Sequence, residues 1–344
     1  MFRSEAMTRL TSLVRVATLC ERRGIAPSDA VGLAREAQER AWSRREFLRA
    51  SAGVAAAVGF GLGRTVAAPV RGSPRIAIVG AGLAGLVCAD TLRRHGLRSA
   101  VYEAHATRVG GRCYSLRGLA TGKVAEKGGE FIDTTHKTMR AYANEFNLAR
   151  EDVGRAPGEV AYFFGGQRYT DEQETMIAFR GKPWLTGSGS NGSAYTDLTN
   201  VQTTWETSPI TAGAVSILTD YAGGNRGRTL AQESVQQRVA PFVAELERVY
   251  PGVSEAAVRS AGQFVAHREH WPSNPLTRGA YTCYLPGQFT SVAGLEGQAA
   301  GRLKFAGEHA DSFYSSQGFM EGACLSGIRA AEEIVADVRA GVLR

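Results

Sequence analysis

The stretch Arg75-Ile76-Ala77-Ile78-Val79-Gly80-Ala81-Gly82-Leu83-Ala84-Gly85 decides the fold of this chain. It begins with a continuous apolar run rich in β-branched residues, which predicts a parallel strand buried on both faces. Glycine then occupies three of the next six positions, at Gly80, Gly82 and Gly85. Glycines at this spacing allow a tight turn after the strand and let a phosphate group approach the backbone closely.

A helix and a second strand are expected directly after this turn. Apolar residues recur at helical spacing over residues 86–92, and Gly96 follows where a helix would end. Residues 99–102 form a second strand-like run, and the acidic Glu103 comes at its end. Strand, glycine turn, helix, strand and acid in this order indicate a dinucleotide-binding unit, a much stronger signal than the glycines alone.

This unit predicts where a dinucleotide would bind. The turn over residues 80–85 includes Leu83 and Ala84 at the start of the helix, where unpaired N–H groups and the helix dipole favour a negatively charged pyrophosphate. Glu103 would accept hydrogen bonds from ribose hydroxyls.

Two more glycine pairs follow the unit, in Arg108-Val109-Gly110-Gly111-Arg112 and in Gly128-Gly129-Glu130-Phe131-Ile132. Paired glycines let the backbone pass close to a cofactor, and an arginine can pair with a phosphate. The first segment resembles the Gly-Gly-Arg signature of flavin-dependent oxidoreductases of the amine oxidase type, and the second resembles the segment that lines the flavin in the same family. The resemblance implies FAD, with these residues among its contacts: Arg108, Gly110, Gly111, Arg112, Gly129, Glu130 and Phe131.

The C-terminal part carries two segments that resemble the same family. Arg302-Leu303-Lys304-Phe305-Ala306-Gly307-Glu308 is expected to be a short strand, and Gly318-Phe319-Met320-Glu321-Gly322-Ala323-Cys324 to open a helix toward Val338. Together they resemble the C-terminal flavin segment of the flavin monoamine oxidases, a family that includes L-amino-acid oxidases and tryptophan 2-monooxygenase. The resemblance implies that the helix start near Met320 stabilises negative charge on the reduced flavin, and that Glu308 contacts the ribityl or pyrophosphate region.

Three aromatic residues are the candidates for the substrate side of the site. By resemblance, Trp271 packs near the flavin, while Tyr281 and Phe319 are the two aromatic faces that orient the substrate amine and exclude water. In family members with covalently bound flavin a cysteine precedes this tyrosine. Here the residue is Ala280, which implies non-covalent FAD. Taken one at a time, each aromatic residue is also consistent with ordinary core packing.

The middle of the chain is shorter than the family pattern. Residues 162–169 run almost directly into residues 175–179, where a family member carries a long stretch of substrate-domain helices. At the place of a lysine that contacts the flavin through water in the family, this chain has Glu174. The helical half of the substrate domain is therefore expected to be missing.

The remaining middle still predicts ordered elements. Residues 214–219 are expected to form a strand, and apolar residues from Val235 to Val249 a core helix that Pro241 bends or shortens. Residues 187–192 are glycine- and serine-rich and are expected to be a flexible loop.

Most of the charge lies at the N-terminal end. The chain has 344 residues, 44% of them hydrophobic, and a net charge of +7. Residues 1–68 hold eleven arginines, no lysine and six acids, so this segment is +5 and the other 276 residues carry only +2. A nearly neutral body gives little support for a nucleic-acid groove, so no nucleic-acid partner is predicted.

The cysteines and histidines do not indicate a metal site. The five cysteines are far apart and include no C-x-x-C pair. His267 and His270 are three residues apart but have no third ligand nearby. No metal is therefore predicted.

Residues 1–68 resemble a twin-arginine export signal. Ser43-Arg44-Arg45-Glu46-Phe47-Leu48-Arg49 precedes a weak apolar run over residues 50–62, and small residues follow before Pro69. The run is too short and too rich in glycine for a stable membrane span. We expect cleavage after Ala67 and export through the twin-arginine machinery to the periplasm or outside the cell. The alternative is a basic amphipathic helix.

The predicted fold class is α/β, with a Rossmann-type FAD-binding domain built from N- and C-terminal segments and a shortened α+β substrate domain. The expected organisation is a signal region over 1–68, two parts of the FAD-binding domain over 69–170 and 275–344, and a truncated substrate domain over 171–274.

The predicted reaction is oxidation of a primary amine or L-amino acid. A hydride passes to the flavin, the imine hydrolyses to an aldehyde or keto acid with release of ammonia, and O₂ reoxidises the flavin to give H₂O₂. No arginine can be assigned to a substrate carboxylate, so amine and amino acid both stay open. The alternatives are tryptophan 2-monooxygenase and a catalytically dead FAD-binding remnant; the follow-on motifs disfavour an NAD-dependent dehydrogenase.

Overall fold

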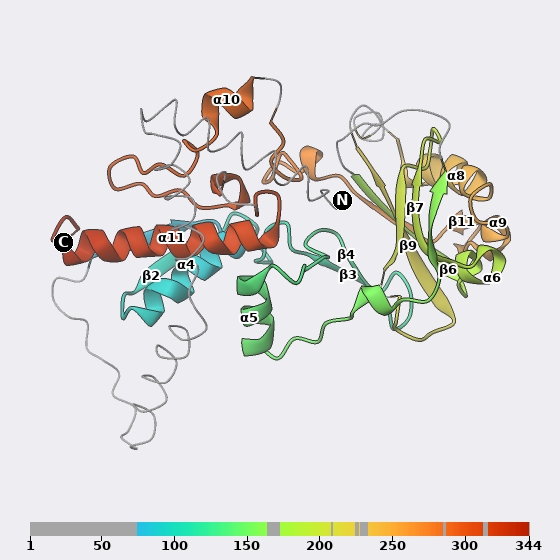
Figure 1. Cartoon of the computed structure of the whole chain (residues 1–344), viewed down its shortest axis with the longest axis horizontal. Coiled ribbons are helices and arrows are strands. Elements are labelled where there is room, and N and C mark those ends of the chain that lie inside the picture. The colour runs from blue at the N-terminus through green and yellow to red at the C-terminus, as the bar shows by residue number, and fades with distance from the viewer. Residues whose placement is uncertain are drawn as a thin grey trace, which may run out of the picture.

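The computed structural model describes residues 74–163, 173–207, 209–223, 227, 233–284, 287–311 and 316–343. The predicted export signal over residues 1–68 lies outside this part of the chain. The described residues form two groups of elements side by side (Figure 1). One combines the beginning and the end of the described chain, and the other is a sheet from its middle.

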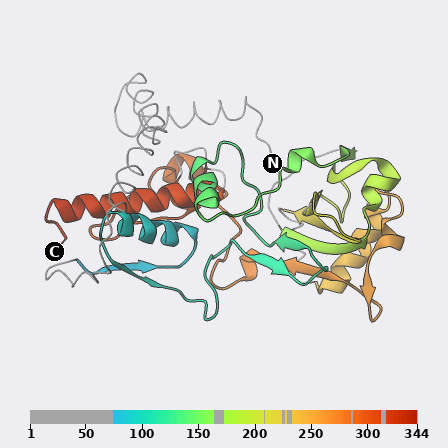
Figure 2. The same cartoon turned by 90° about the horizontal axis from the view of Figure 1, so that it is seen from below.

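The first group is built on two parallel strands and two helices. β1 (Ile76–Val79) pairs with β2 (Ser99–Tyr102), and α4 (Leu83–Arg94) connects them. α11 (Met320–Arg339), from the other end of the chain, lies along α4 (Figure 2). At Gly327 of α11 an added Cβ would lie 2.4 Å from the carbonyl oxygen of Ala84, so this close helix contact requires glycine. The prediction of a Rossmann-type unit assembled from both ends of the chain is confirmed.

This unit is smaller than the sequence suggests. Ile78 is buried against Leu92 and Ala331, but Val79 is 90% exposed, so the prediction that the first strand is buried on both faces is wrong. The reason is that, in the described residues, this sheet has two strands and the helices cover one face. The expected strand over residues 302–308 is also wrong, because the chain there turns back in a single bridge between Ala300 and Leu303.

The second group is a six-stranded sheet in the order β12-β6-β9-β8-β7-β5. Its strands are antiparallel except for β5 and β7, which run parallel. β5 comes from within the segment assigned to the FAD-binding domain. The bounds are β5 Glu159–Phe163, β6 Gln173–Arg180, β7 Ser190–Thr196, β8 Thr203–Thr207, β9 Val215–Ala222 and β12 Ala266–Glu269.

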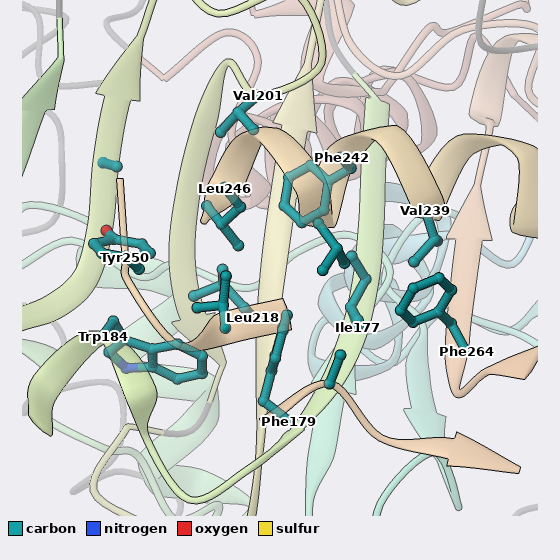
Figure 3. Packing of buried hydrophobic residues seen from close by; sticks show 14 of the residues in the cluster. Ile177, Phe179, Trp184, Val201, Leu218, Val239, Phe242, Leu246, Tyr250 and Phe264 are labelled. Carbon is teal, nitrogen blue, oxygen red and sulfur yellow. The ribbon is translucent and has the colours of Figure 1, made fainter. Parts of the chain in front are cut away.

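One helix covers much of this sheet. α8 (Val235–Leu246) places Phe242 among Ile177 and Leu218 of the strands, all fully buried (Figure 3). α8 begins with a capping box of Ser234 and Gln237 and continues through Pro241 to its end. The predicted helix and the predicted strand, now β9, are confirmed. The shorter α6 (Pro183–Ser188) and α9 (Val253–Ala256) flank the same core.

The prediction of a flexible loop over residues 187–192 is wrong. Gly189 ends α6 with a φ of +68°, and β7 starts at the next residue. Side chains along β7 alternate between buried and half-buried, the pattern of a strand within a sheet. Glycine and serine are tolerated there because Gly192 packs against Trp184 and Glu206, where a Cβ would approach to 3.1 Å.

Shorter elements connect the two groups. β3 and β4 form a hairpin, and α5 packs against α11. Among the described residues no helix is long and apolar enough to cross a membrane. The remaining bounds are β3 Ser115–Arg117, β4 Val124–Glu126, α5 Lys137–Glu145, η1 Val153–Arg155, β10 Arg259–Ser260, β11 Gln263–Phe264, η2 Trp271–Ser273, α10 Gln288–Val292 and η3 Glu308–Ala310.

Candidate functional site

The first glycine turn lies between β1 and α4 and has the form that a pyrophosphate requires. Gly80 has a φ of +100°, and its N–H donates to the carbonyl oxygen of Tyr102 at 2.7 Å, which joins the ends of the two strands. A Cβ on Gly85 would lie 2.1 Å from the Gly80 oxygen, so only glycine fits. No side chain caps the start of α4 at Leu83 and Ala84, as at helix ends that bind phosphate.

The Gly110-Gly111 pair packs directly on the first glycine turn. The N–H of Gly110 donates to the carbonyl oxygen of Ala81 at 2.8 Å, and Gly82 and Gly110 form a parallel bridge. A Cβ on Gly111 would lie 3.2 Å from the Gly82 Cα. The two loops therefore meet backbone to backbone, with no room for side chains between them.

Glu103 is fixed at the end of β2 by backbone donors. Its carboxylate accepts from the N–H of Ala81 and from the N–H of His105, each at 2.7 Å. These hydrogen bonds, that of His105 first, lower the pKa of Glu103. The side chain is exposed and ionised at neutral pH, as a ribose-binding acid should be.

A pocket of about 260 Å³ opens at these strand ends. Gly80, Gly82, Glu103, Arg108 and Gly111 all line it. Arg108 donates to the carbonyl oxygen of Gly111 at 2.7 Å, and its guanidinium lies 4.3 Å from the centre of the Tyr114 ring. The predicted dinucleotide residues at this end are thus gathered around one cavity.

Glu308 joins three segments at the inner end of the site. Its buried carboxylate accepts from Arg112 at 3.1 Å, from the N–H and hydroxyl of Thr282 at 3.2 and 3.1 Å, and from the N–H of Gly318 at 2.8 Å. Arg112 also donates to the carbonyl oxygen of Ala280. Arg112 and Glu308, two of the charged residues predicted as cofactor ligands, therefore pair with each other in this structure.

The start of α11 contacts the glycine segment over residues 128–132. Gly129 has a φ of +81°, and a Cβ there would lie 2.9 Å from the Met320 sulfur. Phe319 is the residue before the helix, and no side chain caps the N–H groups of the first helical turn. The glycine leaves a cradle between residues that are far apart in the sequence, which fits a flat cofactor edge laid against a helix start.

The three aromatic candidates lie in different environments. Trp271 is buried and its ring N–H donates to the carbonyl oxygen of Lys127 at 2.8 Å. Tyr281 is 36% exposed and Phe319 38% exposed, so part of each side chain faces solvent. Tyr281 lies beside Gly318, where a Cβ would be 3.8 Å from its ring. The side chain of Phe319 lies 5.0 Å from that of His136, measured between ring centres.

Glu130 and Phe131 contact the sheet group. Trp205 of β8 donates its ring N–H to the Glu130 carboxyl at 2.8 Å, and its ring lies 5.5 Å from the Phe131 ring. Burial raises the pKa of Glu130 to about 8, and the nearby carboxylate of Glu126 adds to the rise. Both residues were predicted to contact the cofactor; the structure places them where the two groups of elements meet.

Sequence reasoning missed residues that the sheet group supplies. Tyr221 of β9 lies with its hydroxyl 3.0 Å from that of Tyr281, and its ring lies 5.4 Å from Trp205. Outside the sheet group, Asn274, Leu276 and Thr277 also line the pocket that contains Glu103. Strand pairing decides which side chains of the sheet reach the site, and the sequence alone does not give that pairing. The only signal in the sequence for Trp205 and Tyr221 was that they are aromatic.

No metal centre accompanies the site in the described part of the chain, where no three His, Cys, Asp or Glu side chains are grouped to hold an ion. His267 instead lies 3.4 Å from the Glu269 carboxylate.

Comparison with known proteins agrees with this geometry. A sequence profile described as flavin containing amine oxidoreductase matches residues 83–177 and 173–335, more than half of the chain. The chain belongs to the flavin-containing amine oxidoreductase family. The matched residues include the start of α4, the second glycine pair, the three aromatic candidates and most of α11.

Individual relatives match over shorter stretches. An L-amino acid dehydrogenase of Synechocystis sp. is 34% identical over 105 residues, 30% of this chain and 22% of that protein. Tryptophan 2-monooxygenase of Pseudomonas savastanoi is 33% identical over 101 residues, 28% of this chain and 18% of that protein. Putrescine oxidase bound to putrescine has a similar fold, with a TM-score of 0.64, 14% identity, and coverage of 77% of this chain and 99% of that one. The chain thus aligns with about a fifth of the length of these two curated relatives.

Proposed function

We propose that this chain binds FAD non-covalently and oxidises a primary amine or an L-amino acid. One observation carries the proposal: segments from both ends of the chain meet around one site, through Gly129 with Met320 and Arg112 with Glu308. When bound, FAD would accept a hydride from the carbon that bears the amine and pass the electrons to O₂, giving H₂O₂; the imine hydrolyses to aldehyde or keto acid and ammonia. Ala280 before Tyr281 favours a flavin held without a covalent bond.

The chain's own residues would bind and orient the two reactants. Tyr281 and Phe319 present exposed aromatic faces that can hold a neutral amine and exclude water. The start of α11 offers uncapped N–H groups to negative charge on a reduced cofactor. Arg112 pairs with Glu308, so it is not assigned to a substrate carboxylate.

A second candidate is an FAD-binding protein without oxidase activity. By resemblance, Glu174 stands where the family carries a lysine near the flavin, and the short middle of the chain is expected to lack the helical half of the substrate domain. The resemblance to tryptophan 2-monooxygenase keeps an amide product as the further alternative for an active enzyme.

The test is to purify the full chain and measure bound flavin by absorbance, then peroxide release with a panel of amines and L-amino acids. Flavin reduction by substrate without air, followed by peroxide on adding O₂, would support the oxidase. A yellow protein that no substrate reduces would support the second candidate. A colourless protein that does not take up added FAD would overturn both, and an amide product would indicate a monooxygenase.

We further propose that residues 1–68 direct twin-arginine export. Replacing Arg44 and Arg45 by lysine should retain the protein in the cytoplasm of a bacterial host, since the pathway reads the arginine pair. Cell fractionation with an antibody against α11 measures this. Equal export of both forms would contradict the proposal.

A further inference from the structure

The pocket at the ends of β1 and β2 has a second wall that comes from far along the chain. One wall is formed by Val79, Gly80, Tyr102 and Glu103, and the other by Asn274, Leu276 and Thr277. At about 260 Å³ the pocket falls just below the usual range for a whole small-molecule site. It can therefore hold one part of a dinucleotide, and the presence of Glu103 makes this the ribose end.

Three of the residues that line this pocket have large, exposed apolar side chains. Val79 is 90% exposed, Tyr102 61% and Leu276 54%. Exposed apolar side chains around a pocket that also contains polar groups are typical of a ligand site, where the bound ligand covers the apolar surface. A planar heteroaromatic ring suits them, because its faces are apolar while its edge and its sugar can reach the polar groups below.

The second wall is a built turn with its own hydrogen bonds. The hydroxyl of Thr277 donates to the carbonyl oxygen of Trp271 at 2.8 Å, and the N–H of Leu276 donates to the side-chain oxygen of Asn274 at 3.0 Å. Trp271 itself is buried and bonded to the backbone of Lys127. This turn therefore holds Leu276 at the pocket from a fixed base, with 54% of the side chain exposed.

We propose that the 274–277 turn is the outer wall of the adenosine part of the dinucleotide site, with Leu276 covering the adenine ring opposite Tyr102 and Val79. The inference rests on the proposed FAD site and extends it to residues outside the glycine motifs. Adenosine is also half of NAD⁺, and the pocket alone favours neither. The flavin-side contacts at Gly129 and Met320 make FAD the ligand to test first.

The test measures binding and needs no turnover. FAD affinity of the full chain is measured by quenching of flavin fluorescence, and ADP and NAD⁺ affinities are measured directly by isothermal titration calorimetry. Leu276→Ala should weaken FAD and ADP by the same factor, about fivefold, because the lost contact lies in the half that they share. Leu276→Met should retain most of the affinity, since it keeps the apolar surface. Leu148→Ala is the matched control, because Leu148 is 61% exposed and does not line the pocket.

The outcomes separate this inference from the cofactor proposal. Unchanged affinity in Leu276→Ala would overturn the inference, and so would a loss for FAD that ADP does not share. Equal thermal unfolding of wild type and Leu276→Ala without ligand shows that the effect is on binding. If wild type binds no FAD but ADP binding depends on Leu276, the adenosine wall stands and the flavin proposal fails. If wild type binds NAD⁺ more tightly than FAD and Leu276→Ala weakens NAD⁺, the wall is supported and the cofactor assignment is overturned. If neither nucleotide binds, both fail.

Discussion

At Gly85 a single methyl group decides whether the first turn can form. A Cβ there would lie 2.1 Å from the Gly80 oxygen, so Gly85→Ala must shift backbone at the predicted pyrophosphate site. We expect a loss of FAD affinity of about tenfold or more, which corresponds to about 1.4 kcal/mol. Fluorescence titration with FAD checks this. Gly279→Ala is the control, because a Cβ at Gly279 meets nothing within 4 Å. Equal affinity of Gly85→Ala and wild type would show that the dinucleotide does not bind at this turn.

Glu130 gives the stability of the protein a dependence on pH. Its pKa is raised to about 8 in the folded protein from an ordinary value of 4.5, so the folded state binds a proton that the unfolded state lacks between these values. Stability from this group is therefore complete below about pH 4.5 and is lost as the pH rises toward 8. Glu130→Gln keeps an acceptor for the Trp205 ring N–H without the charge.

We expect Glu130→Gln to raise the melting temperature at pH 8 and to flatten the change in melting temperature between pH 5.5 and 8. A stabilisation of about 1 kcal/mol would raise it by roughly 2–4 °C in a protein of this size. Calorimetry at the two pH values measures the difference. Glu332→Gln, at an exposed position of α11, controls for loss of one acid. A pH dependence identical to that of wild type would contradict the raised pKa.

At the scale of the elements, α5 depends on a side chain from α11. Glu321 is buried and accepts from the N–H groups of Thr138 and Met139 at 2.8 Å each, at the start of a helix that no local side chain caps. Glu321→Ala should cost about 1–2 kcal/mol of unfolding free energy, the usual cost of losing a helix cap. Denaturant unfolding measures it, with Glu332→Ala on an exposed turn of the same helix as control. Equal costs for the two variants would show that the contact contributes nothing.

The elements also show what the sequence could predict. The turn at residues 80–85 and the helix that became α11 were predictable because each depends on a local pattern: glycines at fixed spacing, or apolar residues at helical spacing. The strand expected at residues 302–308 failed because a strand needs a partner, and pattern alone cannot supply one. The prediction of a loop at residues 187–192 was wrong for the opposite reason. The residues of β7 have a weak strand preference, but pairing with β5 and β8 makes them a strand.

In the candidate site, too, features that depend on a local sequence pattern were predictable, and features that depend on distant parts of the chain were not. The glycine motifs were predicted because their residue type and spacing are informative, and Tyr281 was predicted by its resemblance to a family segment. Tyr221, Trp205 and Leu276 were missed because they reach the site through strand pairing and through a turn that is remote in the sequence. Glu308 was predicted by resemblance to contact the cofactor, but its pairing with Arg112 could not be predicted because it depends on the folded chain.

At the scale of the whole molecule, the site depends on contacts between the two groups of elements. The sheet group supplies Trp205 to Glu130 and Tyr221 to Tyr281. The Trp205–Glu130 contact joins the sheet to the segment over residues 128–132, and the Tyr221–Tyr281 contact joins it to the predicted substrate side. The sheet group therefore contacts both the cofactor-side segment and the predicted substrate side, through Trp205 of β8 and Tyr221 of β9.

The Tyr221–Tyr281 pair allows this arrangement to be tested across the whole molecule. If the hydroxyl of Tyr221 holds the Tyr281 ring, Tyr221→Phe should slow flavin reduction by a substrate amine about threefold to tenfold, in proportion to the usual strength of one hydrogen bond. In a Tyr281→Phe background the same change should have little further effect, because the pair is already broken. Stopped-flow reduction rates for the four proteins measure this coupling.

Tyr250→Phe is the matched control, since it removes a tyrosine hydroxyl from the buried core of the same sheet group, where its partner is Ser190. It should lower the melting temperature and leave the reduction rate of the bound flavin unchanged. Additive effects of the Tyr221 and Tyr281 substitutions would show that the two residues act independently, and the sheet group would then serve only to support the fold. Coupling in the reduction rate, with the flavin content unchanged, would show that β9 takes part in placing the substrate.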